Sequence, residues 1–157
     1  MMGAIGMIIG SPLLSSLSNR FFRGRKPALI GTAAVSLVLT SALAASPGGF
    51  SRPALMAILF GLGITTNAIV SVGFTASKEL FTVRMAGAAT GLINLFPFLG
   101  GGLMQMFIGG ILGKAGPEGF SPQSWRLAMV TLAACAAVAL AASLFVKETL
   151  GREPAGT

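Results

Sequence analysis

The sequence predicts an all-α fold, a polytopic membrane helix bundle of about five transmembrane helices, and three observations support this prediction. Hydrophobic residues make up 54% of the chain and charged residues only 10%. A water-soluble domain of this length needs more charge to cover its surface. The apolar residues fall into five long runs, each near the ~20 residues that a helix needs to cross a bilayer. None of these runs alternates strictly between apolar and polar residues, as a membrane-spanning strand would.

The five runs predict the helices in order. We expect transmembrane helices at about residues 1–18, 27–46, 53–76, 85–113 and 125–146, followed by a tail at 147–157. Short connectors with helix breakers, such as Ser46-Pro47-Gly48-Gly49, separate the runs. Pro12 and Pro97 lie inside the first and fourth runs. Each should kink its helix, because proline removes one internal hydrogen bond.

The basic residues predict how the bundle is oriented, since cytoplasmic loops carry the excess of Lys and Arg. Eight of the eleven lie in the first connector, the third connector and the tail: Arg20, Arg23, Arg25, Lys26, Lys78, Arg84, Lys147 and Arg152. The other three, on the opposite side, are Arg52, Lys114 and Arg126. We therefore expect an integral protein of a bacterial inner (plasma) membrane, with its N-terminus outside and its C-terminus in the cytoplasm.

The composition also argues against several classes of function. The chain has no His, no Tyr and no Asp, and its single cysteine, Cys135, lies in an Ala-rich run. Without a nucleophile paired to a base, or a cluster of metal ligands, we expect no enzyme activity, no cofactor and no metal. The basic residues lie between apolar runs rather than along one face with aromatic residues. We therefore expect the lipid bilayer as a partner, and no nucleic acid.

Polar residues distinguish two of the expected helices from the others. In 53–76 a polar or small residue recurs at every fourth position, at Gly63, Asn67, Ser71 and Thr75. In 85–113 one face follows a three-four spacing through Gly87, Gly91, Asn94, Phe98, Gly101, Gln105 and Gly109. An amide without a partner in hydrocarbon costs on the order of several kcal/mol, so these faces should point at protein or water.

Two interpretations of these faces stay open. The first is helix packing, in which small residues let backbones approach and amides bond between helices. We expect that packing role for Gly87, Gly91, Gly101, Gly109 and Gly113. The second is a path for a solute, and the candidates to line it are Asn67, Ser71, Asn94 and Gln105. No ionisable residue lies near the middle of an expected span, so we see no site for proton coupling.

The connector at residues 15–26 resembles a motif of known transporters. Its sequence is Ser-Ser-Leu-Ser-Asn-Arg-Phe-Phe-Arg-Gly-Arg-Lys. It is similar to the Gly-x-x-x-Asp-Arg/Lys-x-Gly-Arg/Lys-Arg/Lys loop motif of major facilitator superfamily transporters, in the weaker copy between helices eight and nine. The matching positions are Asn19, Arg20, Gly24, Arg25 and Lys26. The longer spacing before Gly24 looks like the organophosphate and sugar-phosphate antiporter branch. Residues 78–94 also look like the family's region between helices ten and eleven.

The resemblance covers essentially the whole chain, as helices eight to twelve of a twelve-helix transporter. It implies that the chain transports a small organic solute, for example an organic anion or a sugar phosphate. Transport would proceed by alternating access and would need an N-terminal half that is missing here. It also implies that residues 27–46 and 125–146 face lipid, which agrees with the small number of polar residues in these two runs. The motif's acidic position holds Asn19 and its Gly position holds Ser15, so we expect a weakened charge contact at this loop. The alternative function is a small membrane scaffold or assembly subunit without transport activity.

The predicted topology can be tested with a reporter that is active only in the cytoplasm. Fused after Thr157 the reporter should be active, and inserted near Gly48 it should be silent, because the eight-to-three distribution of basic residues places these points on opposite sides. Activity at Gly48 together with silence at Thr157 would overturn the topology.

Overall fold

The computed structural model describes residues 1–20, 24–80, 83–113 and 121–149, and helices account for most of them. The helices are α1 (Met2–Arg20), α2 (Arg25–Ala45), α3 (Arg52–Leu80), α4 (Val83–Gly113) and α5 (Pro122–Phe145). Within the described residues there is no β-strand. The predicted all-α membrane bundle is therefore confirmed.

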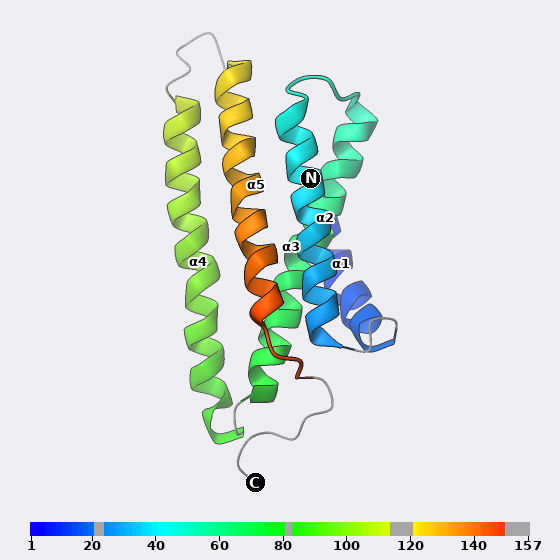
Figure 1. Ribbon diagram of the computed structural model, residues 1–157, viewed down its shortest axis with the longest axis vertical. Coiled ribbons are helices and arrows are strands. Elements are labelled where there is room, and N and C mark those ends of the chain that lie inside the picture. Colours follow the sequence, from blue (N-terminus) through cyan, green and yellow to red (C-terminus); the bar gives the residue numbers. More distant parts are fainter. Residues whose placement is uncertain (21–23, 81–82, 114–120, 150–157) are drawn as a thin grey trace.

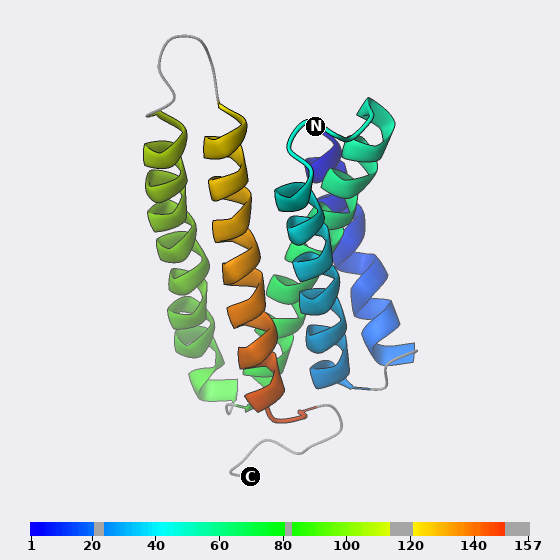
Figure 2. The same cartoon turned by 45° about the horizontal axis from the view of Figure 1, so that its top comes forward.

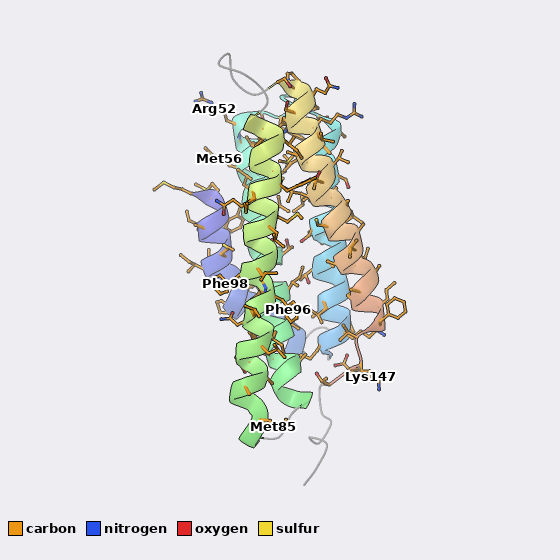
Figure 3. All side chains as sticks on the ribbon, turned by 90° about the vertical axis from the view of Figure 1, so that its left-hand side faces the viewer. Arg52, Met56, Met85, Phe96, Phe98 and Lys147 are labelled. Carbon is orange, nitrogen blue, oxygen red and sulfur yellow. The ribbon has the colours of Figure 1, made fainter. Side chains whose placement is uncertain are left out.

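The helices lie side by side, and successive helices run in opposite directions (Figure 1). Four segments are long and apolar enough to cross a membrane: Arg25–Ala45, Arg52–Ala76, Gly87–Gly113 and Pro122–Phe145. α1 is not among them, because serines and an asparagine from Ser15 onward lower the hydropathy of its last turns. Arg52 and Lys147 lie at opposite ends of the bundle (Figure 3), so the apolar part of the helices lies between these charges.

Local sequence explains where α5 begins. Ser121 is its N-cap, and the Ser121 side chain accepts a hydrogen bond from the backbone N–H of Ser124 at 3.0 Å. Pro122 follows at the first helical position, where a missing N–H costs nothing. The apolar run in the sequence predicts a start at about residue 125. The serine-proline pair starts α5 three residues earlier.

α1 and α3 approach each other so closely that only glycine fits at the contact. A Cβ built on Gly10 would lie 2.8 Å from the Cα of Ile64. A Cβ on Gly63 would collide with the carbonyl oxygen of Gly3, and one on Gly6 would collide with the backbone of α3. Backbones touch in this way only where no side chain intervenes. These close approaches join α1 to the part of α3 around residues 59–64, and the two helices diverge further along (Figure 2).

α2 packs against α3 and α5, and one of its faces is buried. The buried side chains on that face are Ala28, Leu29, Thr32, Ala33, Ser36, Thr40, Leu43 and Ala44. The opposite face is exposed at Val35 and Val38. One face of this helix therefore packs against protein, and the expectation that the helix faces lipid stays a prediction for its exposed face. Small side chains let its neighbours approach, and its hydroxyls, which looked unremarkable in the sequence, lie in the contacts.

α4 is the least covered helix of the bundle. It contacts α3 and α5, and none of the residues in its span Gly87–Gly113 is buried. Phe96 is 66% exposed and Phe98 is 74% exposed, about halfway along the helix (Figure 3). Asn94 and Gln105 are exposed as well. The described residues therefore provide few neighbours for the polar face of α4, and the expectation that this face points at protein or water stays a prediction.

The α1–α3 contact can be tested with two glycines of the same helix. Gly63→Ala should destabilise the fold by about 1–3 kcal/mol, because the added Cβ meets backbone that cannot move aside. Gly73→Ala is the matched control. A Cβ there meets nothing within 4 Å, and alanine should stabilise the helix by up to ~1 kcal/mol. Thermal unfolding followed by circular dichroism would measure both. Equal midpoints for the two variants would contradict the close contact.

Candidate functional site

A polar hollow lies between α3 and α4, and we call it the α3/α4 hollow. Its volume is about 470 Å³, and it is lined by Asn67, Val70, Ser71, Phe74, Thr75, Thr90 and Asn94. Three of the four residues proposed from the sequence to line a solute path, Asn67, Ser71 and Asn94, therefore meet here. Gln105 is not among the lining residues.

Helical periodicity brings the lining residues together. Asn67, Ser71 and Thr75 lie four residues apart on α3, so they stack on one face of that helix. Thr90 and Asn94 have the same spacing on α4. The two faces oppose each other where α3 and α4 are in contact. The four-residue spacing could be seen in the sequence, whereas the pairing of the two faces could not.

Asn67 also holds α1 in place. Its Nδ2 donates a hydrogen bond to the carbonyl oxygen of Met7. Pro12 lies nearby in α1 and has no N–H, which leaves the carbonyl of Ile8 without its usual helical donor. Asn67 thus bonds to the backbone just before this irregular turn. One N–H of Asn67 serves helix packing, while the residue also lines the hollow.

The chemistry of the hollow is that of neutral hydrogen-bonding groups. Five of its seven lining residues carry an amide or a hydroxyl, one carries an aromatic ring, and none carries a formal charge. The Thr75 hydroxyl donates to the carbonyl oxygen of Ser71 at 3.0 Å, so its oxygen remains an acceptor. This lining suits a site that binds through hydrogen bonds and contains no nucleophile–base pair.

The basic loop motif is joined to the end of the chain by a carboxylate. The backbone N–H of Arg25 donates to Oε1 of Glu148 at 2.7 Å, and that of Lys26 donates to Oε2 at 3.1 Å. These are orphan N–H groups of the first turn of α2, where negative charge is also favoured by the helix dipole. Gly24 is the N-cap residue and provides no side-chain cap of its own. Glu148 therefore caps α2 from more than a hundred residues away.

The position of Glu148 explains why a glycine stands at this position of the motif. A Cβ on Gly24 would lie 2.5 Å from Oε2 of Glu148, so any other residue would push the carboxylate away. Arg25 is only 7% exposed. Asn19 and Arg20 form the end of α1, but their side chains lie outside the described part of the structure. We expected a weakened charge contact because Asn19 replaces the motif's acid. The tail supplies a carboxylate to the same loop.

The sequence analysis missed a buried hydroxyl pair between α2 and α3. Ser36 Oγ donates to Thr65 Oγ1 at 2.8 Å, and Thr65 donates to the carbonyl oxygen of Leu62 at 3.2 Å. Both side chains are buried. The only sequence signal was the spacing of Thr32, Ser36 and Thr40, which puts three hydroxyls on one face of α2.

Among the described residues, no atom contacts the positions of the five glycines that were predicted to pack helices. A Cβ on Gly87, Gly91, Gly101, Gly109 or Gly113 would meet nothing within 4 Å among the described residues. The glycines that do allow close packing lie in α1 and α3. A packing role for the α4 glycines therefore stays a prediction, and it requires a partner outside this chain.

The Glu148 cap makes a testable prediction about α2. Glu148→Ala removes the acceptor for two backbone N–H groups and should cost about 1–2 kcal/mol locally. Exchange of the Arg25 and Lys26 amides with deuterium should then speed up by roughly five- to thirtyfold. Lys147→Ala, at the neighbouring exposed residue, is the control and should leave exchange unchanged. Unaltered protection in Glu148→Ala would rule out the cap.

A comparison with known families gives one match. The family model of the Major Facilitator Superfamily matches residues 1–156, which include both the α3/α4 hollow and the basic loop. No curated protein and no solved structure matches the chain.

Proposed function

The chain belongs to the major facilitator superfamily of membrane transporters, and from that premise we propose that it forms the C-terminal part, about helices eight to twelve, of a twelve-helix transporter. In this proposal the chain moves a small organic solute by alternating access, in which two halves rock around a site near the middle of the membrane. The basic loop and the tail lie in the cytoplasm.

The observation that carries the proposal is the α3/α4 hollow. Two helices that are otherwise apolar enough to cross a membrane place amides and hydroxyls opposite each other there. Polar side chains at membrane depth are costly unless they meet protein, water or a solute. A hollow lined in this way is what a solute path requires.

The uncovered surface of α4 supports the presence of a second half. Asn94 and Gln105 carry amides on this surface, and Phe96 and Phe98 are more than half exposed. Amides left against hydrocarbon would cost on the order of several kcal/mol, so this surface calls for a protein partner or for water. We propose that the N-terminal half of the transporter provides that partner.

The branch and the substrate are a finer proposal. The spacing before Gly24 is the feature that favours the organophosphate and sugar-phosphate antiporters. In that branch the residues that bind the anion belong to helices one and seven, so they would come from outside this chain. A transported organic anion would then be held jointly by the two halves.

The alternative is a small membrane scaffold or assembly subunit. The bond from Asn67 to Met7 favours it, because that amide joins two helices and a scaffold needs only packing faces. The polar lining of the α3/α4 hollow has no task in this alternative, so we prefer the transporter.

Uptake into vesicles tests the two-half proposal. Any reading frame that continues upstream of Met1 would be joined to this chain and compared with the chain alone, using a panel of labelled small solutes. We expect uptake only when both halves are present, because five helices cannot gate both sides of a central site. Equal uptake by the chain alone would contradict the proposal, and absence of uptake from both would favour the scaffold.

A serine pair tests whether the hollow is the path. Ser71→Ala removes a hydroxyl from the lining and should weaken the apparent affinity roughly tenfold. Ser41→Ala, at an exposed position of α2, is the matched control and should change little. Ser71 is a cleaner test than Asn67, whose replacement would also remove the bond to Met7. Equal affinities in the two variants would place the path elsewhere.

A further inference from the structure

We infer that the α3/α4 hollow binds an uncharged, hydroxyl-bearing part of the solute, a sugar ring or a polyol chain. This inference rests on the transport function proposed above and names the chemistry that this half of the site recognises. Three observations support it. Some hydrogen-bonding atoms of the lining residues are not used within the protein, part of the lining is apolar, and none of the seven lining residues carries a charge.

The bonds within the protein leave acceptors in the hollow. The proton of the Thr75 hydroxyl is given to the Ser71 carbonyl, and one N–H of Asn67 is given to the Met7 carbonyl. These two side chains retain the Thr75 oxygen and the Asn67 carbonyl oxygen, which accept hydrogen bonds, and the second N–H of Asn67, which donates. A solute hydroxyl can donate to such atoms. A carboxylate or phosphate cannot, because it only accepts.

Asn94 adds both kinds of group from the other helix. Its side chain has two N–H donors and one carbonyl acceptor, and it lines the hollow from α4 while Asn67 lines it from α3. A hydroxyl group both donates and accepts, so neighbouring hydroxyls of one solute could bond to the amides of both helices. An anion is held more strongly where a positive charge lies at close range, and none of the seven lining residues carries one.

The rest of the lining fits a ring or carbon chain. Val70 and Phe74 lie one helical turn apart on α3 and give the hollow an apolar part. Small-molecule sites combine such apolar and aromatic surface with a few well-placed polar groups. A sugar or polyol presents C–H groups between its hydroxyls and so matches both parts of the lining.

Direct binding to this chain in lipid nanodiscs would test the inference. The probes are a hexose, a hexitol, the phosphate ester of the same hexose, and a dicarboxylate of similar size. We expect the hexose, the hexitol and the phosphate ester to bind, and the dicarboxylate not to compete with them. Asn94→Leu should weaken hexose and hexitol binding roughly tenfold.

Gln123→Leu is the matched control. Gln123 is an exposed amide on α5 and does not line the hollow. It should leave hexose binding unchanged. Asn94→Ser is the second variant. It keeps a donor and an acceptor and should lose less affinity than Asn94→Leu, which separates recognition from any effect on folding.

Three results would overturn the inference: no binding of hexose or hexitol, competition by the dicarboxylate as strong as that by the hexose, or equal affinities for Asn94→Leu and the unmodified chain. Failure of the transport proposal looks different. If hexose binding and its loss in Asn94→Leu are found but the two joined halves take up no solute, the transport function fails. If uptake of another solute is found without hexose binding, only the substrate class is wrong.

Discussion

The close approach of α1 and α3 is the contact on which the rest of the arrangement depends. Glycines at this contact, among them Gly10 and Gly63, allow the two backbones to touch, and any Cβ there would collide with backbone atoms. Within the same contact the Asn67 amide donates a hydrogen bond to the Met7 carbonyl oxygen. The same face of α3 then turns Ser71 toward α4 as part of the polar hollow. A packing constraint thus fixes the position of the candidate site.

Polar groups elsewhere in the bundle are paired in ways that hold distant segments together. The buried Ser36–Thr65 hydrogen bond links α2 to α3. The Glu148 carboxylate brings the end of the chain to the first turn of α2 and uses N–H groups that have no partner within the helix. Both interactions follow from one requirement. A polar group removed from water must find a protein partner, or its desolvation cost is not recovered.

α4 combines the weakest coverage with the most distinctive polar face. None of the residues in its span Gly87–Gly113 is buried, and few buried contacts mean low local stability within this chain. The same helix supplies Asn94 and Thr90 to the hollow. Elements that move during a functional cycle are commonly those with the lowest local stability. α4 is thus incompletely covered and carries half of a polar site. This agrees with the proposal that another part of the transporter packs against α4 and completes the site.

The sequence by itself determined the membrane class, the all-α bundle and the approximate limits of the helices, because these depend on the length and hydropathy of local runs. It also singled out Asn67, Ser71 and Asn94, since a polar residue inside an apolar run is conspicuous. Only the tertiary structure decided which faces meet. It placed Asn67, Ser71 and Asn94 around one hollow, left Gln105 outside it, buried the hydroxyl face of α2, and brought Glu148 to Gly24. Local patterns show what a helix face contains, but contacts between segments far apart in the chain are set by how closely the backbones can approach.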